Sequence, residues 1–215
     1  MVDLAENSIT GASGDVTSWL DLIMKGGIVM IPIILLSFIS IYIFIEKWMY
    51  LRRATAIDQG QVNSLLSNLR AGNREKAANQ PQTDVTATGR IIGSGLEMSG
   101  RPMQEIESHI ESVTNLEITK MEKDTGYLGI IAGIAPMLGF IGTISGVIKI
   151  FYNISLADNI SIGIIAGGLY QKMICSGAGL IVGVLAYTGY HILQMKIDRY
   201  TISLQEILIK FIKVL

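Results

Sequence analysis

Apolar residues are concentrated in three long blocks of this chain, and polar residues fill the segments between them. The blocks cover residues 26–45, 125–152 and 162–195. Each block contains no more than one charged side chain and is long enough for an α-helix to cross a hydrocarbon core of roughly 30 Å. This pattern predicts three transmembrane helices.

The polar segments have the periodicity of amphipathic helices, in which apolar residues repeat at three- and four-residue steps. Residues 46–124 contain two such series, and residues 196–215 contain a third. The apolar positions are Val62, Leu65, Leu66 and Leu69; Met103, Ile106, Ile110, Val113 and Leu116; and Ile197, Leu204, Ile207, Leu208, Phe211 and Leu215. We therefore predict an all-α integral membrane protein whose three transmembrane helices carry long cytoplasmic helical extensions.

Glycine and proline mark where these helices are expected to stop. The first amphipathic series should end at Ala71-Gly72-Asn73, and Pro81 is expected to close a loop. No proline lies between Pro102 and Pro136, so we expect one continuous helical rod from about Met103 to Tyr152. At 1.5 Å per residue, that rod would measure about 75 Å.

The distribution of basic residues predicts the orientation. Of the 17 lysines and arginines, all but Lys25, Lys149 and Lys172 lie in residues 46–124 and 196–215. By the positive-inside rule, these two segments are cytoplasmic. The acidic N-terminal segment, residues 1–25, and the short turn 153–161 are then periplasmic. Residues 1–25 lack a secretory cleavage pattern, and apolar residues around Trp19 favour a short amphipathic helix that anchors at the membrane interface or docks a partner.

Composition excludes several classes of function. Half of the residues (50%) are hydrophobic and only 16% are charged, which is too apolar for a soluble protein. The net charge of −1 gives no nucleic-acid footprint. Cys175 is the only cysteine, and His109 and His191 are far apart, so we expect no disulfide framework, no metal site and no cofactor. The sequence contains no recognisable nucleophile–base pair and no phosphate-binding loop, so we do not expect an enzyme.

Small residues are dense in the second and third blocks. Such residues allow helices to approach closely in a membrane, and we predict that they form helix-packing contacts. The predicted packing residues are Pro136, Gly139, Gly142, Gly146, Gly179 and Gly183. Two interpretations stay open from this pattern alone: a helix that lines a multi-helix pore, and a helix that packs tightly and conducts nothing.

Four polar residues lie inside the second and third blocks, and they are the candidates for chemistry: Thr143, Gln171, Lys172 and Ser176. A hydroxyl in lipid often bonds only to the carbonyl one turn earlier. A lysine near a helix centre is harder to explain, because it costs roughly 2.5 to 3.5 kcal/mol on insertion scales. Lys172 and Ser176 share one helix face with small residues, which suits a pore or a docking groove.

Carboxylates are scarce in the same region. Between Asp124 and Asp198 the only acid is Asp158, in the predicted outer turn. A proton relay through a membrane needs a titratable group near its middle. If this chain conducts protons, another polypeptide is expected to supply that acid, and a nearby lysine would favour its ionised form.

Three sequence segments resemble the MotA/TolQ/ExbB proton channel family. They are I-A-P-M-L-G-F-I-G-T-I-S-G-V at 134–147, L-R-A-G-N at 69–73 and A-G-G-L-Y-Q-K-M-I-C-S-G-A-G-L at 166–180. Three spans with an outside N-terminus resemble ExbB and TolQ more than MotA. The resemblance assigns Thr143 to the family's pore threonine and Ser176 to a position where ExbB usually has threonine. Gln171 stands where ExbB and TolQ usually have glutamate, so an ionisable group is lost there.

The resemblance also implies an assembly and a function. It implies a homopentamer in the bacterial inner membrane around an ExbD-like single-span partner, whose transmembrane aspartate carries the proton. The implied output is energy transfer through a TonB-like protein to outer-membrane transport. The alternatives are a TolQ-like motor for envelope integrity or gliding, and a non-conducting helical membrane scaffold. Sodium and proton both stay open as the ion.

Overall fold

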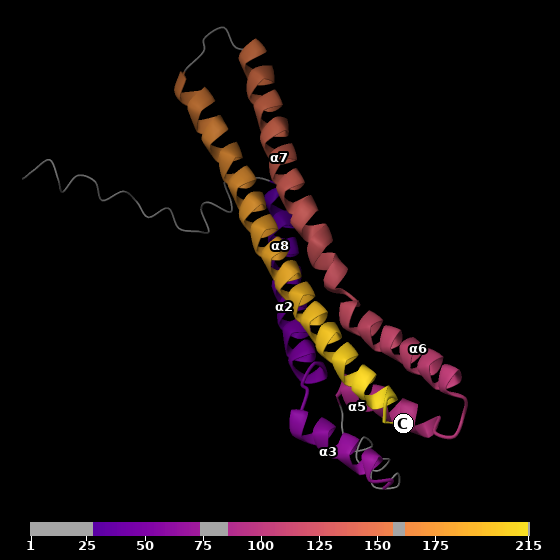
Figure 1. Cartoon of the computed structure of the whole chain (residues 1–215). Helices are drawn as coiled ribbons and strands as arrows, with labels where there is room; N and C mark the ends of the chain where they lie inside the picture. The colour runs from indigo at the N-terminus through magenta and orange to yellow at the C-terminus, as the bar shows by residue number, and fades with distance from the viewer. Residues whose placement is uncertain (1–27, 74–85, 157–161, 215) are drawn as a thin grey trace, which may run out of the picture. The chain divides into compact units, whose positions relative to one another are not determined.

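The computed structural model describes residues 28–73, 86–156 and 162–214, and helices are the only regular secondary structure in these ranges. Three of the helical stretches are long and apolar enough to cross a membrane. They contain α2 (Met30–Ala54), α7 (Thr125–Ser155) and α8 (Ile162–Ile212) (Figure 1). The prediction of an all-α membrane protein with three spans is confirmed. The predicted interfacial helix in residues 1–25 and the loop at Pro81 lie outside the described residues.

The first apolar helix continues beyond the predicted membrane span. The apolar block ends at residue 45, but α2 continues to Ala54 because no glycine or proline interrupts the following residues. Leu51, in this extension, is completely buried. The helix ends where the backbone N–H and the Oγ1 hydroxyl of Thr55 both donate to the Leu51 carbonyl, at 2.9 and 2.7 Å.

The chain divides into two compact units, to which α2, α7 and α8 each contribute residues. The first unit comprises residues 1–39 and 130–186. In its described part, α7 and α8 lie side by side (Figure 1), with the start of α2 against them. Its buried core is small and contains Ile33, Ile131, Ala135, Cys175, Val182 and Ala186. Most other large apolar side chains on these helices are exposed, as lipid-facing residues would be.

The second unit comprises residues 40–129 and 187–215. It contains α3 (Gln59–Arg70), α5 (Ala87–Glu97) and α6 (Met103–Glu122). Capping side chains fix two of the helix starts: Asp58 accepts from the Gly60 N–H at 2.8 Å, and Thr86 accepts from the Gly89 N–H at 3.2 Å. The predicted apolar face of α3 is buried throughout, and α3 ends at Arg70 as expected.

The last part of α8 is the centre of this second core. One helix continues to Ile212, and the predicted stripe from Ile197 to Phe211 is buried. It meets α5 and α6 at Gly95, where a β-carbon would lie 2.9 Å from atoms of both Ile110 and Phe211. The amphipathic C-terminal extension was therefore correctly predicted from its spacing.

The prediction of a continuous rod from Met103 to Tyr152 is wrong. α6 ends at Glu122 and α7 begins at Thr125. Between them, Asp124 has a φ of 67°, which is the left-handed conformation and cannot continue an α-helix. The Asp124 carboxylate pairs with the buried Lys47 ammonium at 3.3 Å. A tertiary ion pair thus accompanies this break, and no proline or glycine marked it in the sequence.

The buried face of α6 also differs from the prediction. Ile106 and Ile110 are buried, but Met103 is 43% exposed and Leu116 is 54% exposed. The buried line continues instead through Thr114, Glu117 and Met121. Two polar residues occupy positions that an apolar pattern does not reveal.

Candidate functional site

The candidate site is built on the contact between α7 and α8 in the first unit. A β-carbon added at Gly139 would lie 3.1 Å from the Ser176 Cα atom, and one at Gly142 would lie 2.7 Å from the Cys175 Sγ atom. One turn further along α7, a β-carbon at Gly146 would overlap the side chain of Lys172. These three pairs define an antiparallel register that places both polar residues of α8 opposite the glycines of α7.

The same register continues toward the start of α7. A β-carbon at Gly179 would lie 2.5 Å from the Ala135 carbonyl oxygen and 3.1 Å from the Gly139 Cα atom. At Gly183 it would lie 2.6 Å from the Pro136 Cγ atom. All six residues singled out for helix packing therefore lie between α7 and α8. Close approach of the two backbones requires a missing side chain at Gly179 in particular.

Lys172 lies with its stem against α7. Its Cγ, Cδ and Cε atoms occupy the space beside Gly146, and the residue is partly buried. The alkyl stem thus fills the groove left by a glycine, and only the ammonium at its tip is polar. In the described residues, Lys172 forms none of the ion pairs.

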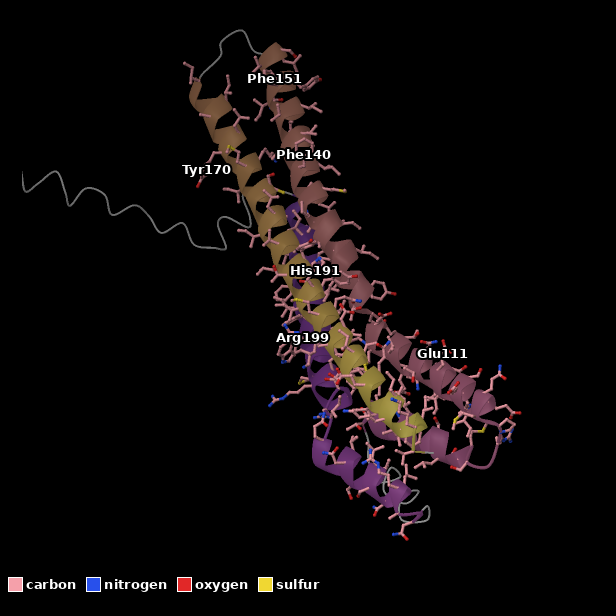
Figure 2. The ribbon with its side chains drawn as sticks, viewed as in Figure 1. Glu111, Phe140, Phe151, Tyr170, His191 and Arg199 are labelled. Carbon is pink, nitrogen blue, oxygen red and sulfur yellow. The ribbon has the colours of Figure 1, made fainter. Side chains whose placement is uncertain are left out.

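Thr143 lies on the turn between Gly142 and Gly146 and is partly exposed. Its hydroxyl donates to the carbonyl of Phe140, which is labelled in Figure 2, at 2.7 Å. A hydroxyl has one proton and two lone pairs. With its proton used in this way, Thr143 offers an acceptor to any donor that approaches α7.

Ser176 and Gln171 complete the set of predicted polar residues. Ser176 is partly buried on α8, where its backbone faces Gly139. Gln171 belongs to α8 and directly precedes Lys172, but its side chain is outside the described part of the structure. Lys172 and Ser176 therefore lie against the turns of α7 that contain Thr143.

A second polar cluster, which the sequence analysis missed, lies in the second unit. The buried carboxylate of Glu117 on α6 pairs with the Arg90 guanidinium on α5 and accepts from Lys120 Nζ at 2.7 Å. Burial alone would raise the pKa of Glu117, but the hydrogen bonds from Arg90 and Lys120 outweigh it and hold that pKa below its ordinary value. The hydrogen bond to Glu117 in turn raises the pKa of Arg90.

Near this cluster, the structure places further buried polar groups. The Thr88 and Tyr200 hydroxyls lie 3.1 Å apart. The Thr114 hydroxyl, one turn before Glu117, is buried with no hydrogen-bond partner in the described residues. The sequence did contain a signal for this cluster. Thr114 and Glu117 are polar residues that continue the helical spacing of the buried residues of α6. In the described ranges, no group of three or more His, Cys, Asp or Glu side chains is arranged to hold a metal ion.

Comparison with known proteins identifies the family. The sequence profile of the MotA/TolQ/ExbB proton channel family matches residues 83–206, which include all of α5 to α7 and most of α8. This chain belongs to the MotA/TolQ/ExbB proton channel family. The matched region contains every predicted pore residue and packing residue.

Individual relatives of this family member are distant in sequence. An ExbB homolog for biopolymer transport from Methanothermobacter thermautotrophicus is 28% identical, over 83% of this chain and 64% of the homolog. The biopolymer transport protein ExbB of Pseudomonas putida is 23% identical, over 92% of this chain and 63% of that protein. The Tol-Pal system protein TolQ of Haemophilus influenzae is 23% identical, over 84% of this chain and 86% of TolQ. The chain thus spans a little under two thirds of the length of these two ExbB proteins.

Proposed function

We propose that this chain is the multi-span subunit of an inner-membrane stator that couples the proton motive force to motion. Its partner is an ExbD-like single-span protein, and its output is a TonB-like protein that energises outer-membrane transport. The observation that carries the proposal is the register of α7 and α8, two helices matched by the family profile. It places Lys172 and Ser176 of α8 against the turns of α7 that contain Thr143.

The partner supplies the titrating acid. The sequence from residue 125 to residue 197 contains one carboxylate, Asp158, outside the apolar blocks. A carboxyl group on a partner helix beside α7 and α8 provides the group that a proton relay needs. A homopentamer of this chain surrounds the partner in this proposal, with the N-terminus in the periplasm and the C-terminus in the cytoplasm.

The polar residues treat the two forms of that acid differently. Because the Thr143 proton is donated to Phe140, Thr143 accepts, and only the protonated carboxyl group donates to it. The Lys172 ammonium favours the ionised carboxylate. Ser176 and Gln171 offer hydrogen bonds to either form. A partner aspartate that moves between Thr143 and Lys172 therefore gains a proton near one and releases it near the other.

The energy of this step is sufficient for mechanical work. Each unit charge that crosses a potential of 100 mV releases about 2.3 kcal/mol. This free energy, released for each proton, is available to drive a rotation or tilt of the partner inside the assembly. The proposal therefore links each protonation cycle to one conformational step.

Reconstitution tests this function. Vesicles are prepared with this chain alone, with the chain and its single-span partner, and with a partner whose transmembrane aspartate is replaced by asparagine. Proton uptake is measured with a pH-sensitive dye under an imposed potential. We expect uptake only from the unmodified pair. Equal uptake by the chain alone would contradict the proposal that the partner supplies the titrating acid. No uptake by an assembled pair would support the non-conducting scaffold.

A TolQ-like role is the second candidate, and one observation favours it. The TolQ of Haemophilus influenzae is as similar to this chain as the ExbB of Pseudomonas putida, at 23% identity to each. A strain lacking the gene separates the two roles. Loss of iron or haem uptake with an intact envelope supports the ExbB-like role, whereas detergent sensitivity or loss of gliding with normal uptake supports the TolQ-like role.

A further inference from the structure

A basic cavity lies at the C-terminal end of α2, within the second unit. It has a volume of about 830 Å³ and is lined by residues from the end of α2, the turn that follows it and the start of α5. The lining residues are Met49, Tyr50, Arg52, Arg53, Ala54, Ala56, Thr86 and Arg90. Three of the eight are arginines, and no carboxylate is among them.

The positive charge of this cavity comes mainly from Arg52 and Arg53. Arg90 already pairs with Glu117, which neutralises its charge. Arg52 and Arg53 are exposed in the last turn of α2. A helix C-terminus contributes only roughly half a negative charge. This does not offset the two positive charges of the guanidinium groups, so the cavity is cationic. Guanidinium groups also match the geometry of phosphate oxygens better than ammonium groups do.

A further cation lies beside Arg52. The Lys196 ammonium on α8 stacks on the Trp48 ring, 4.5 Å from its centroid, and the charge of Arg52 acts on it through space. These like charges repel each other, and an anion bound between them offsets that repulsion by attracting both. The cluster of Arg52, Arg53 and Lys196 is therefore suited to an anionic group.

An apolar track leads from the cavity along α2. Tyr42, Ile45 and Met49 are 67%, 51% and 55% exposed. They follow one another at three- and four-residue steps, so they lie on one face of the helix, and Met49 also lines the cavity. If the phosphate of a lipid binds Arg52 and Arg53, its alkyl chain would lie along this face.

We propose that this cavity binds the headgroup of an anionic phospholipid, with one acyl chain along Tyr42, Ile45 and Met49. The position supports a lipid over a soluble phosphate, because α2 is one of the three helices apolar enough to cross a membrane and the cavity is at its end. Basic residues beside aromatic residues at the end of a span are the usual surroundings of an acidic headgroup. The inference does not depend on which ion the assembly conducts.

Lipid binding by the purified full-length chain tests this site. Native mass spectrometry compares the retention of dioleoylphosphatidylglycerol and dioleoylphosphatidylcholine. Two variants address the cavity: Arg52→Gln with Arg53→Gln removes the charge, and Ala56→Trp fills the space while all charges stay. Ala56 is exposed, so this change leaves the core intact. The matched control is Arg70→Gln with Arg101→Gln, two exposed arginines that do not line the cavity.

We expect the wild type to prefer phosphatidylglycerol by about tenfold. Both cavity variants should lose this preference, and the control should keep it. An unchanged preference in the double arginine variant overturns the proposal, as does an equal loss in the control, which would indicate bulk electrostatics. Glycerol 3-phosphate is the competitor that tests the source of the phosphate. Displacement of the lipid at equal concentration overturns the lipid assignment in favour of a soluble anion site.

Discussion

The side chain of Lys172 lies in the space that the missing side chain of Gly146 leaves open. A β-carbon at Gly146 would overlap the Cγ, Cδ and Cε atoms of Lys172. The glycine therefore determines where the lysine stem runs, and with it the place of a positive charge between two membrane helices. A charged group there is costly, which argues that its placement matters to function more than to stability.

Replacement of Gly146 by alanine should alter function with little loss of stability. The three atoms nearest to the new methyl group belong to the flexible side chain of Lys172, which can rotate away. We therefore expect a loss of about 1 kcal/mol in the free energy of unfolding, at the low end of the cost of overpacking. Partner-dependent proton uptake should fall because the ammonium is displaced. Gly133→Ala is the matched control, since a β-carbon at Gly133 meets nothing within 4 Å. Equal uptake by the two variants would contradict a role for the position of Lys172.

Replacement of Gly179 by alanine should have the opposite effect and destabilise the protein. Its β-carbon would meet the carbonyl oxygen of Ala135 and the backbone of Gly139, and backbone atoms cannot move without separating α7 from α8. We expect a loss of about 1 to 3 kcal/mol, measured by thermal unfolding in detergent. Gly177→Ala, also on α8 but in open space, should be neutral or stabilising by up to about 1 kcal/mol. Similar melting temperatures for both variants would show that this contact is unimportant.

These glycines also show what sequence reasoning achieves in this protein. Helical spacing predicted the buried faces of α3 and of the end of α8, because those faces depend only on local periodicity. The density of small residues indicated close packing, but only the fold gives the register that pairs Gly146 with Lys172. The break at Asp124 and the partner of the buried Glu117 were not predictable, since each involves a residue distant in sequence, Lys47 or Arg90.

The pair between Lys47 and Asp124 leads to a third prediction. Asp124→Asn keeps a residue that tolerates the left-handed conformation but removes the charge opposite Lys47, which is only 8% exposed. The expected loss is about 1 kcal/mol. This is the low end of the roughly 1 to 3 kcal/mol that an unpaired buried group costs, because the Asp124 side chain is 38% exposed and solvent screens its charge. Chemical unfolding at pH 7 measures it. Asp198→Asn, an exposed acid on α8, is the control, and an equal loss there would argue against the pair.

Glu117 makes stability depend on pH in a defined direction. Its pKa in the folded protein lies below the ordinary value, so the unfolded chain takes up this proton first as pH falls. The contribution of Glu117 is therefore complete above about pH 4.3 and is lost as pH decreases through the folded pKa. We expect Glu117→Gln to destabilise the protein by about 1 to 3 kcal/mol at neutral pH. The loss should become smaller in acid.

Thermal unfolding at pH 7 and pH 3.5, followed by circular dichroism in detergent, measures this dependence. Glu111→Gln is the matched control, because Glu111 is on the same helix but exposed (labelled in Figure 2). It should leave the melting temperature at both pH values close to that of the wild type. A Glu117→Gln variant with the same pH dependence as the wild type would show that this carboxylate does not contribute to acid sensitivity.

The two hydroxyls on α7 and α8 provide the test of the proposed ion path. Thr143→Val keeps the volume of the side chain and removes the acceptor, and Ser176→Ala removes the second hydroxyl. Because the Thr143 hydroxyl bonds only within its own helix turn, we expect the free energy of unfolding to change by less than about 1 kcal/mol. Partner-dependent proton uptake should fall at least about tenfold, equivalent to roughly 1.4 kcal/mol in the barrier.

The control is Ser155→Ala, which removes a hydroxyl at the end of α7 that bonds back to Tyr152 in the same way. If the double variant conducts as fast as this control, the path does not pass these residues.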